Sequence, residues 1–275
     1  MSCSTKHNDV TLALAQKESR QHHEGMSELY SYMRNKPLII KAYSSSHPNY
    51  LKETNPKLKC SKTVHFLRHG QGFHNLMADM YASAGKEWNQ YERSDNNPYI
   101  LPEVLDAPLT QKGREQAKAV QSLVQAMRHQ PELVVSSSNC RALQTGLIAF
   151  GHLKVQFIAH EMAREETGVH VCDKRRTIQE QKVDFPTVDF QLIENDHDLL
   201  FREDRRENKM EIGERIYTFM EWLGKRDEQH ICVTSHSGWL MTLFNGIVDC
   251  EEEHLKEWFQ TGELRSVKLE FDFQR

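Results

Sequence analysis

The sequence predicts an α/β fold with three layers, in which a mostly parallel β-sheet is covered by helices on both faces. Two observations lead to this prediction. Short apolar segments alternate with amphipathic helical segments from residue 61 onward, and four of the apolar segments end in polar side chains. Such alternation is typical of parallel sheets, because each connection between parallel strands has to cross one face of the sheet.

Four short apolar segments are expected to form buried strands, and they are 64–67, 133–135, 155–159 and 231–234. Polar residues follow each of them, at the carboxyl end of the expected strand. In open parallel sheets, ligands bind beyond these carboxyl ends. Residues 267–273 alternate apolar and charged side chains instead, which indicates a half-exposed strand at an edge of the sheet.

Three helices are expected between these strands. Thr110 stands where an N-cap would be, and Pro131 ends the helical segment that follows it. The second helix spans 141–150, with Gly151 after it as a C-cap. The third is marked by apolar residues spaced three and four apart over 212–223. The apolar face of the first helix comprises Ala117, Val120, Leu123, Val124 and Met127.

The chain is expected to form one domain over residues 61–275, preceded by an extension over residues 1–60 that packs on or near it. The extension is polar, and an amphipathic helix is expected between Val10 and Met33. Two polar excursions interrupt the domain, at 76–108 and 169–210. We expect these excursions to form the walls of a pocket, because specificity usually resides in loops carried by a rigid scaffold.

The composition argues against several classes of protein. Lys and Arg number 35 against 39 Asp and Glu, so the net charge of −4 gives no argument for nucleic-acid binding. The six cysteines stand singly, without the paired spacing of zinc sites, which indicates reduced thiols. No segment approaches the roughly 18 apolar residues of a membrane span, and the first residues lack the apolar stretch of a signal peptide. We therefore expect a cytoplasmic protein with no membrane attachment.

Side chains suited to phosphoryl transfer follow the expected strands. A phosphoryl group carries up to two negative charges, which planar guanidinium groups bind through pairs of oxygens. A neutral imidazole can attack phosphorus, and a carboxyl group can protonate the leaving oxygen and later accept a proton from water. The candidates, in chain order, are Arg68 and His69, Arg141, Glu165, and His236.

Four of the candidate assignments stay open from the residues alone. Asn75 is either a donor to a phosphate oxygen or the cap of the helix that follows. Arg141 is either a phosphate clamp at a helix start or a surface arginine. The acid is either Glu165 or Glu166, and two adjacent acids also suit a solvated helix start. His236 is either a donor to the phosphoryl group or a core histidine with satisfied hydrogen bonds.

Five motifs, in this order along the chain, resemble those of the histidine phosphatase superfamily, which includes the cofactor-dependent phosphoglycerate mutases. They are Phe66-Leu67-Arg68-His69-Gly70, Leu109-Thr110-Gln111-Lys112-Gly113, Ser137-Ser138 with Arg141-Ala142-Leu143-Gln144-Thr145, Arg164-Glu165, and Ser235-His236-Ser237-Gly238. The resemblance covers residues 60–275 and implies a phosphoglycerate mutase-like fold that needs no metal or cofactor. It implies that His69 carries the phosphoryl group and that Glu165 donates and accepts the proton. The ligands it implies around the phosphoryl group are Arg68, Asn75, Arg141 and His236.

The chain also departs from the family pattern. Family members often have glutamate after Arg68-His69-Gly70, where this chain has Gln71, which we keep as a candidate substrate ligand. True mutases carry a glutamate-arginine-histidine-tyrosine-glycine stretch at the acid, whereas this chain has Arg164-Glu165-Glu166-Thr167-Gly168, which favours a hydrolase. Residues 168–176 resemble the mutase-like phosphatases of fungi and plants. Within them, Arg175 and Arg176 either reach a second anionic group of the substrate or form a solvated basic pair.

The resemblance therefore implies an enzyme that hydrolyses phosphate monoesters of small metabolites through a phosphohistidine intermediate. A phosphomutase, which returns the phosphoryl group to another hydroxyl, is one alternative. A non-enzymatic module that binds a phosphorylated ligand is another. The sequence indicates neither the substrate nor the oligomeric state.

Overall fold

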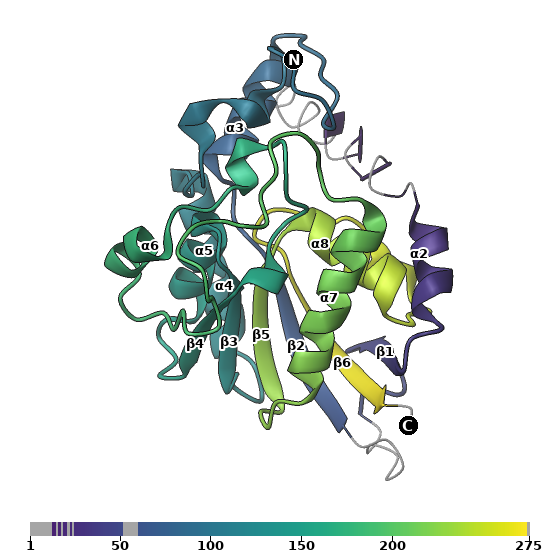
Figure 1. Cartoon of the computed structure of the whole chain (residues 1–275). Coiled ribbons are helices and arrows are strands. Elements are labelled where there is room, and N and C mark those ends of the chain that lie inside the picture. The colour runs from purple at the N-terminus through teal and green to yellow at the C-terminus, as the bar shows by residue number, and fades with distance from the viewer. Residues whose placement is uncertain are drawn as a thin grey trace, which may run out of the picture.

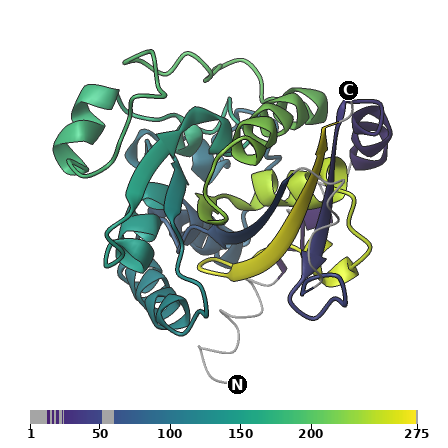
Figure 2. The ribbon, with the colours of Figure 1, turned by 90° about the horizontal axis from the view of Figure 1, so that it is seen from below.

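A six-stranded β-sheet forms the centre of the molecule, and helices lie on both of its faces (Figure 1, Figure 2). The computed structural model describes residues 13, 14, 16, 17, 19, 20, 23, 25–51 and 60–273. The order of the strands across the sheet is β1-β6-β2-β5-β3-β4. Their bounds are β1 (Leu38–Ser44), β2 (Cys60–Arg68), β3 (Leu133–Ser137), β4 (Gln156–His160), β5 (His230–Ser235) and β6 (Leu264–Phe273).

The four segments expected to form buried strands lie in β2, β3, β4 and β5, and these strands are parallel to one another. β2 pairs with β5, β5 pairs with β3, and β3 pairs with β4. β6 runs antiparallel to both of its neighbours, β1 and β2. The mostly parallel sheet predicted from the alternation of apolar segments and helices is confirmed.

β6 is not the half-exposed edge strand that its alternating sequence suggests. It lies between β1 and β2, and its apolar side chains Val267, Leu269 and Phe271 are fully buried. The edge-strand prediction was wrong because β1, which comes from the amino-terminal part of the chain, pairs with the outer side of β6. A pattern within one strand shows which side chains are buried, but it does not show whether another strand covers its edge.

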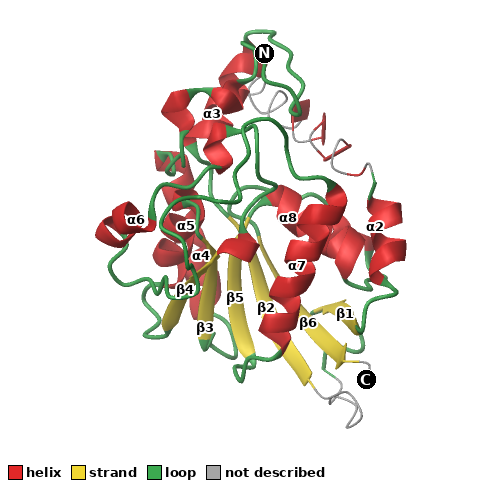
Figure 3. Ribbon diagram, in the orientation of Figure 1, coloured by secondary structure: helices red, strands yellow, loops and turns green. Residues whose placement is uncertain are grey.

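Different helices cover the two faces of the sheet. Adjacent strand residues point to opposite layers, so Phe66 packs with one set of helices and Leu67 packs with the other. Figure 3 shows these helices on both sides of the strands, which confirms the three-layer α/β/α architecture. The helices on the face of Leu67 are α4 (Gln111–Gln125) and α5 (Cys140–Phe150). Those on the face of Phe66 are α2 (Met26–Met33), α7 (Lys209–Gly224) and α8 (Ser237–Thr242).

α4 shows how well a helix and its cap can be predicted from local sequence. The Thr110 side chain accepts a hydrogen bond from the backbone N–H of Gly113, so it is the predicted N-cap. Val120 and Val124 are buried as expected, but Leu123 is 58% exposed. The buried stripe on this helix is therefore narrower than the predicted apolar face, because Leu123 lies to one side of the line that Val120 and Val124 form.

The two polar excursions carry further helices near the carboxyl ends of the parallel strands. Among these helices, α3 lies above the sheet in Figure 1. Their helices are α3 (Phe73–Ser83), α6 (Ile178–Asp184), and the 3₁₀ helices η1 (Pro98–Ile100), η2 (Pro102–Val104) and η4 (Val171–Asp173). Elsewhere lie η3 (Glu161–Ala163), the π-helical η5 (Leu243–Ile247) and α9 (Glu253–Lys256).

Part of the expected amino-terminal extension belongs to the fold itself. β1 is a strand of the sheet, and Met26, Leu29 and Met33 of α2 pack in its larger core. The helix expected between residues 10 and 33 is described continuously only at its end, as α2, and residues 10–12 lie outside the described part. Within the described residues, every helix is too short or too polar to cross a membrane.

Candidate active site

The carboxyl ends of four parallel strands bring the predicted catalytic side chains together, and all of them except His236 line one cleft. His69 follows β2, Arg141 lies in the first turn of α5 after β3, and Glu165 follows β4 through η3. His236 follows β5 and caps α8. The cleft has an empty volume of about 440 Å³ and is lined by Arg68, His69, His74, Asn75, Gln90, Tyr99, Arg141, Glu165, His170, Cys172, Asp173, Arg206, Ser237 and Trp258.

His69 is held as a neutral imidazole with a defined tautomer. Its Nδ1 lies 2.7 Å from the backbone carbonyl of Gly70, which can only accept a hydrogen bond, so Nδ1 carries the proton. Its Nε2 therefore carries no proton and has a lone pair that can accept a hydrogen bond or attack an electrophile. Burial, followed by the charge of the Arg141 guanidinium, holds the pKa of His69 well below 6.5. The side chain is thus prepared to act as a nucleophile at Nε2.

Arg141 is almost completely buried, and its guanidinium is fixed by three partners. Its Nε donates to Nε2 of His69 at 3.2 Å, and its Nη1 donates to the carbonyl of Cys172 at 2.6 Å. Its Nη2 pairs with the Asp173 carboxylate at 2.7 Å. These contacts place a permanent positive charge beside the candidate nucleophile, as a phosphate clamp requires.

His236 is fully buried against the candidate nucleophile and does not itself line the cleft. Its ring centroid is 5.0 Å from that of His69, and its Nε2 lies 2.8 Å from the Ser137 hydroxyl. Its buried Nδ1 has no hydrogen-bond partner among the residues that the structure describes. Burial and the charge of Arg141 lower the pKa of His236 well below 6.5, so the ring is neutral at physiological pH.

Arg68 and Asn75 border both this cleft and a neighbouring cavity. Nη1 of Arg68 donates to the carbonyl of Phe259 at 2.6 Å, and its guanidinium lies 5.6 Å from the centroid of the Trp258 ring. The amide oxygen of Asn75 accepts the backbone N–H of Gly72 at 3.0 Å. This oxygen caps α3, which leaves the amide nitrogen of Asn75 for a ligand. The two interpretations of Asn75 are therefore compatible.

Glu165 and Glu166 have distinct environments. Glu165 lines the cleft, and its carboxylate accepts the backbone N–H groups of Gly238 and Trp239 at 3.0 and 2.9 Å. Burial, followed by the negative charge of Asp173, raises the pKa of Glu165 above 4.5 despite these hydrogen bonds. Glu166 is fully buried and is ion-paired with Arg206 and Lys209. Of the two carboxyl groups, only that of Glu165 faces the cleft.

Comparison with known proteins gives the same family as these side chains indicate. The sequence model described as histidine phosphatase superfamily (branch 1) matches residues 64–275. The chain belongs to the histidine phosphatase superfamily. A phosphoglycerate mutase-like protein of Arabidopsis thaliana is 33% identical over 248 residues, which cover 78% of this chain and 86% of the relative.

Two other proteins are similar to this chain. Phosphoglycerate mutase-like protein 1 of Arabidopsis thaliana is 32% identical over 78% of this chain and 83% of its own length. Among solved structures, phosphoglycerate mutase from Bacillus anthracis str. Sterne aligns over 78% of this chain and 90% of its own, with 13% identity and a TM-score of 0.49.

Besides His236, three of the predicted substrate ligands, Gln71, Arg175 and Arg176, do not line the cleft in this member of the superfamily. Gln71 lines the neighbouring cavity, and its side-chain oxygen accepts a hydrogen bond from the Thr110 hydroxyl. Arg175 is buried elsewhere, with Nε bound to Glu161 at 2.8 Å and its Nη atoms bound to backbone carbonyls. Arg176 pairs with Asp106 and Asp184. Because acidic partners hold both arginines away from the cleft, we do not assign them to a second anionic group.

Sequence reasoning missed several cleft residues, most of which lie in the two excursions. The main ones are His74, Tyr99, His170, Asp173 and Arg206. The ring of His74 lies 5.5 Å from that of His69, and that of Tyr99 lies 4.7 Å from that of His170. His74 stands within the motif that carries His69 and Asn75, so its position was a usable signal. The other residues lie in irregular segments, and no periodic pattern in the sequence predicts where the backbone of such segments runs.

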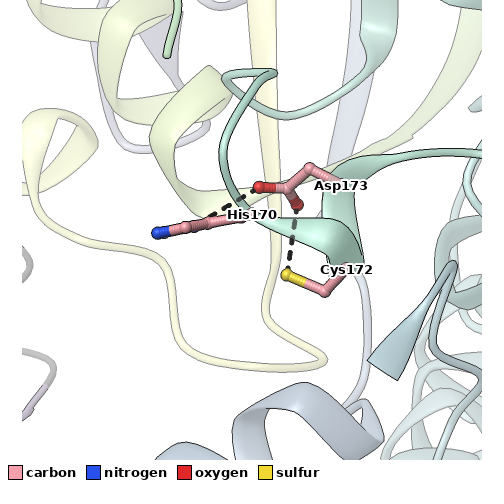
Figure 4. Close-up of side chains that lie close together, drawn as sticks. All are labelled: His170, Cys172 and Asp173. Atoms are coloured by element: carbon pink, nitrogen blue, oxygen red, sulfur yellow. Dashed lines mark hydrogen bonds and ion pairs between the residues drawn. The ribbon is translucent and has the colours of Figure 1, made fainter. Parts of the chain in front are cut away.

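His170, Cys172 and Asp173 place three potential metal-ligand atoms within 4.8 Å of one another (Figure 4). The surroundings of this cluster do not suit a cation. The guanidinium groups of Arg141 and Arg206 already contact both oxygens of Asp173, at 2.7 and 3.2 Å. Burial raises the pKa of the Cys172 thiol well above 9.0, so the sulfur keeps its proton. We assign no metal to this cluster.

Proposed function

We propose that the protein is a phosphomonoesterase that forms a phosphohistidine at His69. The proposal rests mainly on one observation: the unprotonated Nε2 of His69 accepts a hydrogen bond from Nε of Arg141 at 3.2 Å, inside a cleft that also contains a carboxyl group with a raised pKa. A nucleophile, a fixed positive charge and a proton donor are the three groups that hydrolysis of a phosphate ester through a covalent intermediate requires.

In the first step, Nε2 of His69 attacks phosphorus and a bond forms between them. The bond from phosphorus to the ester oxygen breaks, and Glu165 in its acid form gives its proton to that oxygen as the alcohol leaves. The Nδ1 proton of His69 stays on the ring, where its hydrogen bond to the Gly70 carbonyl stabilises the positive charge of the phosphorylated imidazole.

In the second step, the Glu165 carboxylate removes a proton from water. The water oxygen forms a bond to phosphorus, the bond from phosphorus to Nε2 of His69 breaks, and inorganic phosphate is released. Glu165 is then protonated and His69 is neutral again. Arg68 and Arg141 balance the charge on the phosphoryl oxygens throughout, because guanidinium groups remain protonated at every working pH.

We propose hydrolysis in preference to phosphoryl transfer between hydroxyls because of the segment at the acid. The glutamate-arginine-histidine-tyrosine-glycine stretch of true mutases is replaced by Arg164-Glu165-Glu166-Thr167-Gly168. In this chain Glu166 is buried in ion pairs with Arg206 and Lys209, so it offers no group to a second substrate hydroxyl. A small phosphorylated metabolite as substrate and a cytoplasmic location complete the proposal.

The nucleophile is tested by trapping. Wild-type protein mixed briefly with a phosphate ester and quenched in alkali should carry an acid-labile phosphohistidine, and His69→Ala should carry none. His65→Gln is a matched control, because His65 is a buried histidine of β2, the strand that His69 follows, and it does not line the cleft. Equal labelling of the wild type and His69→Ala would refute the assignment. A wild type that is folded yet never labelled, with any ester of a broad panel, would favour the binding module instead.

The type of reaction is tested with 3-phosphoglycerate. Release of inorganic phosphate with glycerate supports hydrolysis, whereas isomerisation without free phosphate would show a mutase. If the protein does not accept 3-phosphoglycerate, neither product forms. A simple alkyl phosphate is therefore assayed in parallel for release of inorganic phosphate.

A further inference from the structure

Asp173 is a buried carboxylate in the wall of the cleft, 3% exposed, that joins two arginines distant in the sequence. Nη2 of Arg141 donates to its Oδ1 at 2.7 Å, and Nη1 of Arg206 donates to its Oδ2 at 3.2 Å. Figure 4 shows the same carboxylate in contact with the ring of His170 and the thiol of Cys172. Because both oxygens are used by guanidinium groups, small movements of Asp173 would move both arginines.

On one side, Asp173 fixes the orientation of the phosphate clamp. Arg141 points its Nε at His69 and its two Nη atoms at Cys172 and Asp173. Of these partners, Asp173 is the only one with a negative charge. The planar guanidinium group cannot rotate without losing that ion pair, so the Asp173 carboxylate determines which face of Arg141 meets a phosphoryl group.

On the other side, Asp173 connects to the acid through Arg206. Nε and Nη2 of Arg206 donate to the side chain and the carbonyl of Glu166, at 3.1 and 2.7 Å. The backbone N–H of Glu166 in turn donates to Oε1 of Glu165 at 3.0 Å. Hydrogen bonds therefore link Arg141 to Asp173, Asp173 to Arg206, Arg206 to Glu166, and the backbone of Glu166 to the acid Glu165.

We propose that Asp173 is a positioning residue that ties the phosphate-binding Arg141 to the acid Glu165, so that the clamp and the proton donor face the same phosphoryl group. The inference rests on the proposed phosphomonoesterase function. It assigns no bond-making step to Asp173 itself, which acts through Arg141 and Arg206.

The charge of Asp173 reaches the acid as well as the clamp. After burial, it is the largest cause of the raised pKa of Glu165. Burial opposes ionisation of Asp173, but His170 and the two guanidinium groups hold its pKa well below 3.8, so it stays charged. Other charged groups close to Glu165 are Glu166, beside it in the chain, Arg141 and Arg206, and Arg215, whose Nη2 donates to the backbone carbonyl of Glu165 at 2.9 Å.

The test uses the full chain with three substitutions. Asp173→Asn removes the charge, Asp173→Glu keeps the charge but displaces it, and Asp198→Asn is the matched control. The side chain of Asp198 is as buried as that of Asp173 and pairs with Arg164 at 2.6 Å, yet neither Asp198 nor Arg164 lines the cleft. The measurements are the folded state by circular dichroism, the inhibition constant of inorganic phosphate, and the pH dependence of kcat with an alkyl phosphate.

We expect Asp173→Asn to weaken inhibition by phosphate about tenfold, because Arg141 loses its orientation. In a plot of kcat against pH, the decrease on the alkaline side (the alkaline limb) should move to lower pH by about one unit in this variant. The reason is that Glu165 loses a neighbouring negative charge, so its pKa falls. Asp173→Glu should weaken inhibition by phosphate and keep the alkaline limb of the wild type. Asp198→Asn should change stability without moving either quantity.

A folded Asp173→Asn with the phosphate inhibition and the alkaline limb of the wild type would overturn the inference. An equal shift of the alkaline limb in Asp198→Asn would also overturn the inference, because the shift would then follow from the loss of any buried carboxylate. If Asp173→Asn does not fold, Asp173→Glu decides, and unchanged inhibition by phosphate in that variant overturns the inference. A wild type that hydrolyses no phosphate ester refutes the proposed function instead, which is a separate outcome.

Discussion

Nε of Arg141 lies 3.2 Å from Nε2 of His69, and both side chains are almost fully buried. The guanidinium group donates to the nitrogen that carries the lone pair, so it occupies part of the space where a phosphoryl group would lie. It also keeps His69 unprotonated, because its charge opposes a second positive charge nearby. Burial is the larger cause of the low pKa of His69, and this contact adds to it while placing the proposed clamp beside the proposed nucleophile.

Loss of the planar guanidinium group of Arg141 should be harmful even when the positive charge is kept. Arg141→Lys keeps a positive charge but loses the planar arrangement that binds His69 and Asp173 together, so kcat/KM for a phosphate ester should fall about 10²- to 10³-fold. Arg175→Lys is the control, because Arg175 is an equally buried arginine outside the cleft. Its kcat/KM should stay near that of the wild type, and an equal loss in both variants would contradict the assignment.

Glu165→Gln should lower activity in a way that depends on the leaving group. An alkoxide is a poor leaving group and needs a proton, so kcat for an alkyl phosphate should fall about 10²- to 10⁴-fold. The fall should be much smaller for formation of phospho-His69 from p-nitrophenyl phosphate, measured as a burst of p-nitrophenol, because p-nitrophenolate leaves without a proton.

Glu166→Gln is the comparison for that experiment. It breaks a buried contact with Arg206 and Lys209, so it should lower stability without changing the dependence on the leaving group. If Glu166→Gln alone lost the alkyl phosphate activity, the acid would have to be reassigned.

Acid should destabilise the fold well before its carboxylates are protonated. Burial lowers the pKa of several histidines, to about 4 for His65 and His170. The unfolded chain takes up protons at these positions below pH 6.5 and the folded chain does not, so stability falls as the pH falls through 6.5 and continues to fall toward pH 4. Each such histidine contributes about 1.4 kcal/mol per pH unit in that window.

The pH dependence is measured by urea unfolding at pH 7, 6 and 5. His65→Gln should reduce the slope of unfolding free energy against pH by about 1.4 kcal/mol per unit between pH 6 and 5, because one titrating group is removed. His152→Gln, at an exposed histidine, is the control variant. A slope in His65→Gln equal to that of the wild type would show that His65 is protonated in the folded protein.

The turn that carries His69 depends on two glycines in close contact. A Cβ at Gly70 would lie 2.4 Å from the carbonyl oxygen of Gly113, and a Cβ at Gly113 would lie 2.2 Å from that of Gln71. Gly113→Ala should therefore cost about 1–3 kcal/mol of unfolding free energy, since backbone atoms have to move. Gly85→Ala is the control for strain alone, because Gly85 has a φ of 72° and open space around it. A smaller cost for Gly113→Ala than for Gly85→Ala would contradict the close contact.

The sequence by itself determined the parallel core of the sheet, the cap of α4 and the residues at the strand ends. These features are local: Thr110 caps its own helix, and the polar residues His69 and His236 directly follow apolar strands. Parallel strands bring their carboxyl ends to one edge, so the order of the motifs was enough to predict that Arg141 meets His69.

Only the tertiary structure decided which charges the cleft contains. Arg175 and Arg176 pair with acids outside the cleft, whereas Arg206, from the same excursion, reaches Asp173 inside it. The covered edge of β6 is a second example, because β1 comes from a distant part of the chain. Ion pairs and strand edges depend on contacts between segments far apart in sequence, and periodicity within one segment carries no information about them.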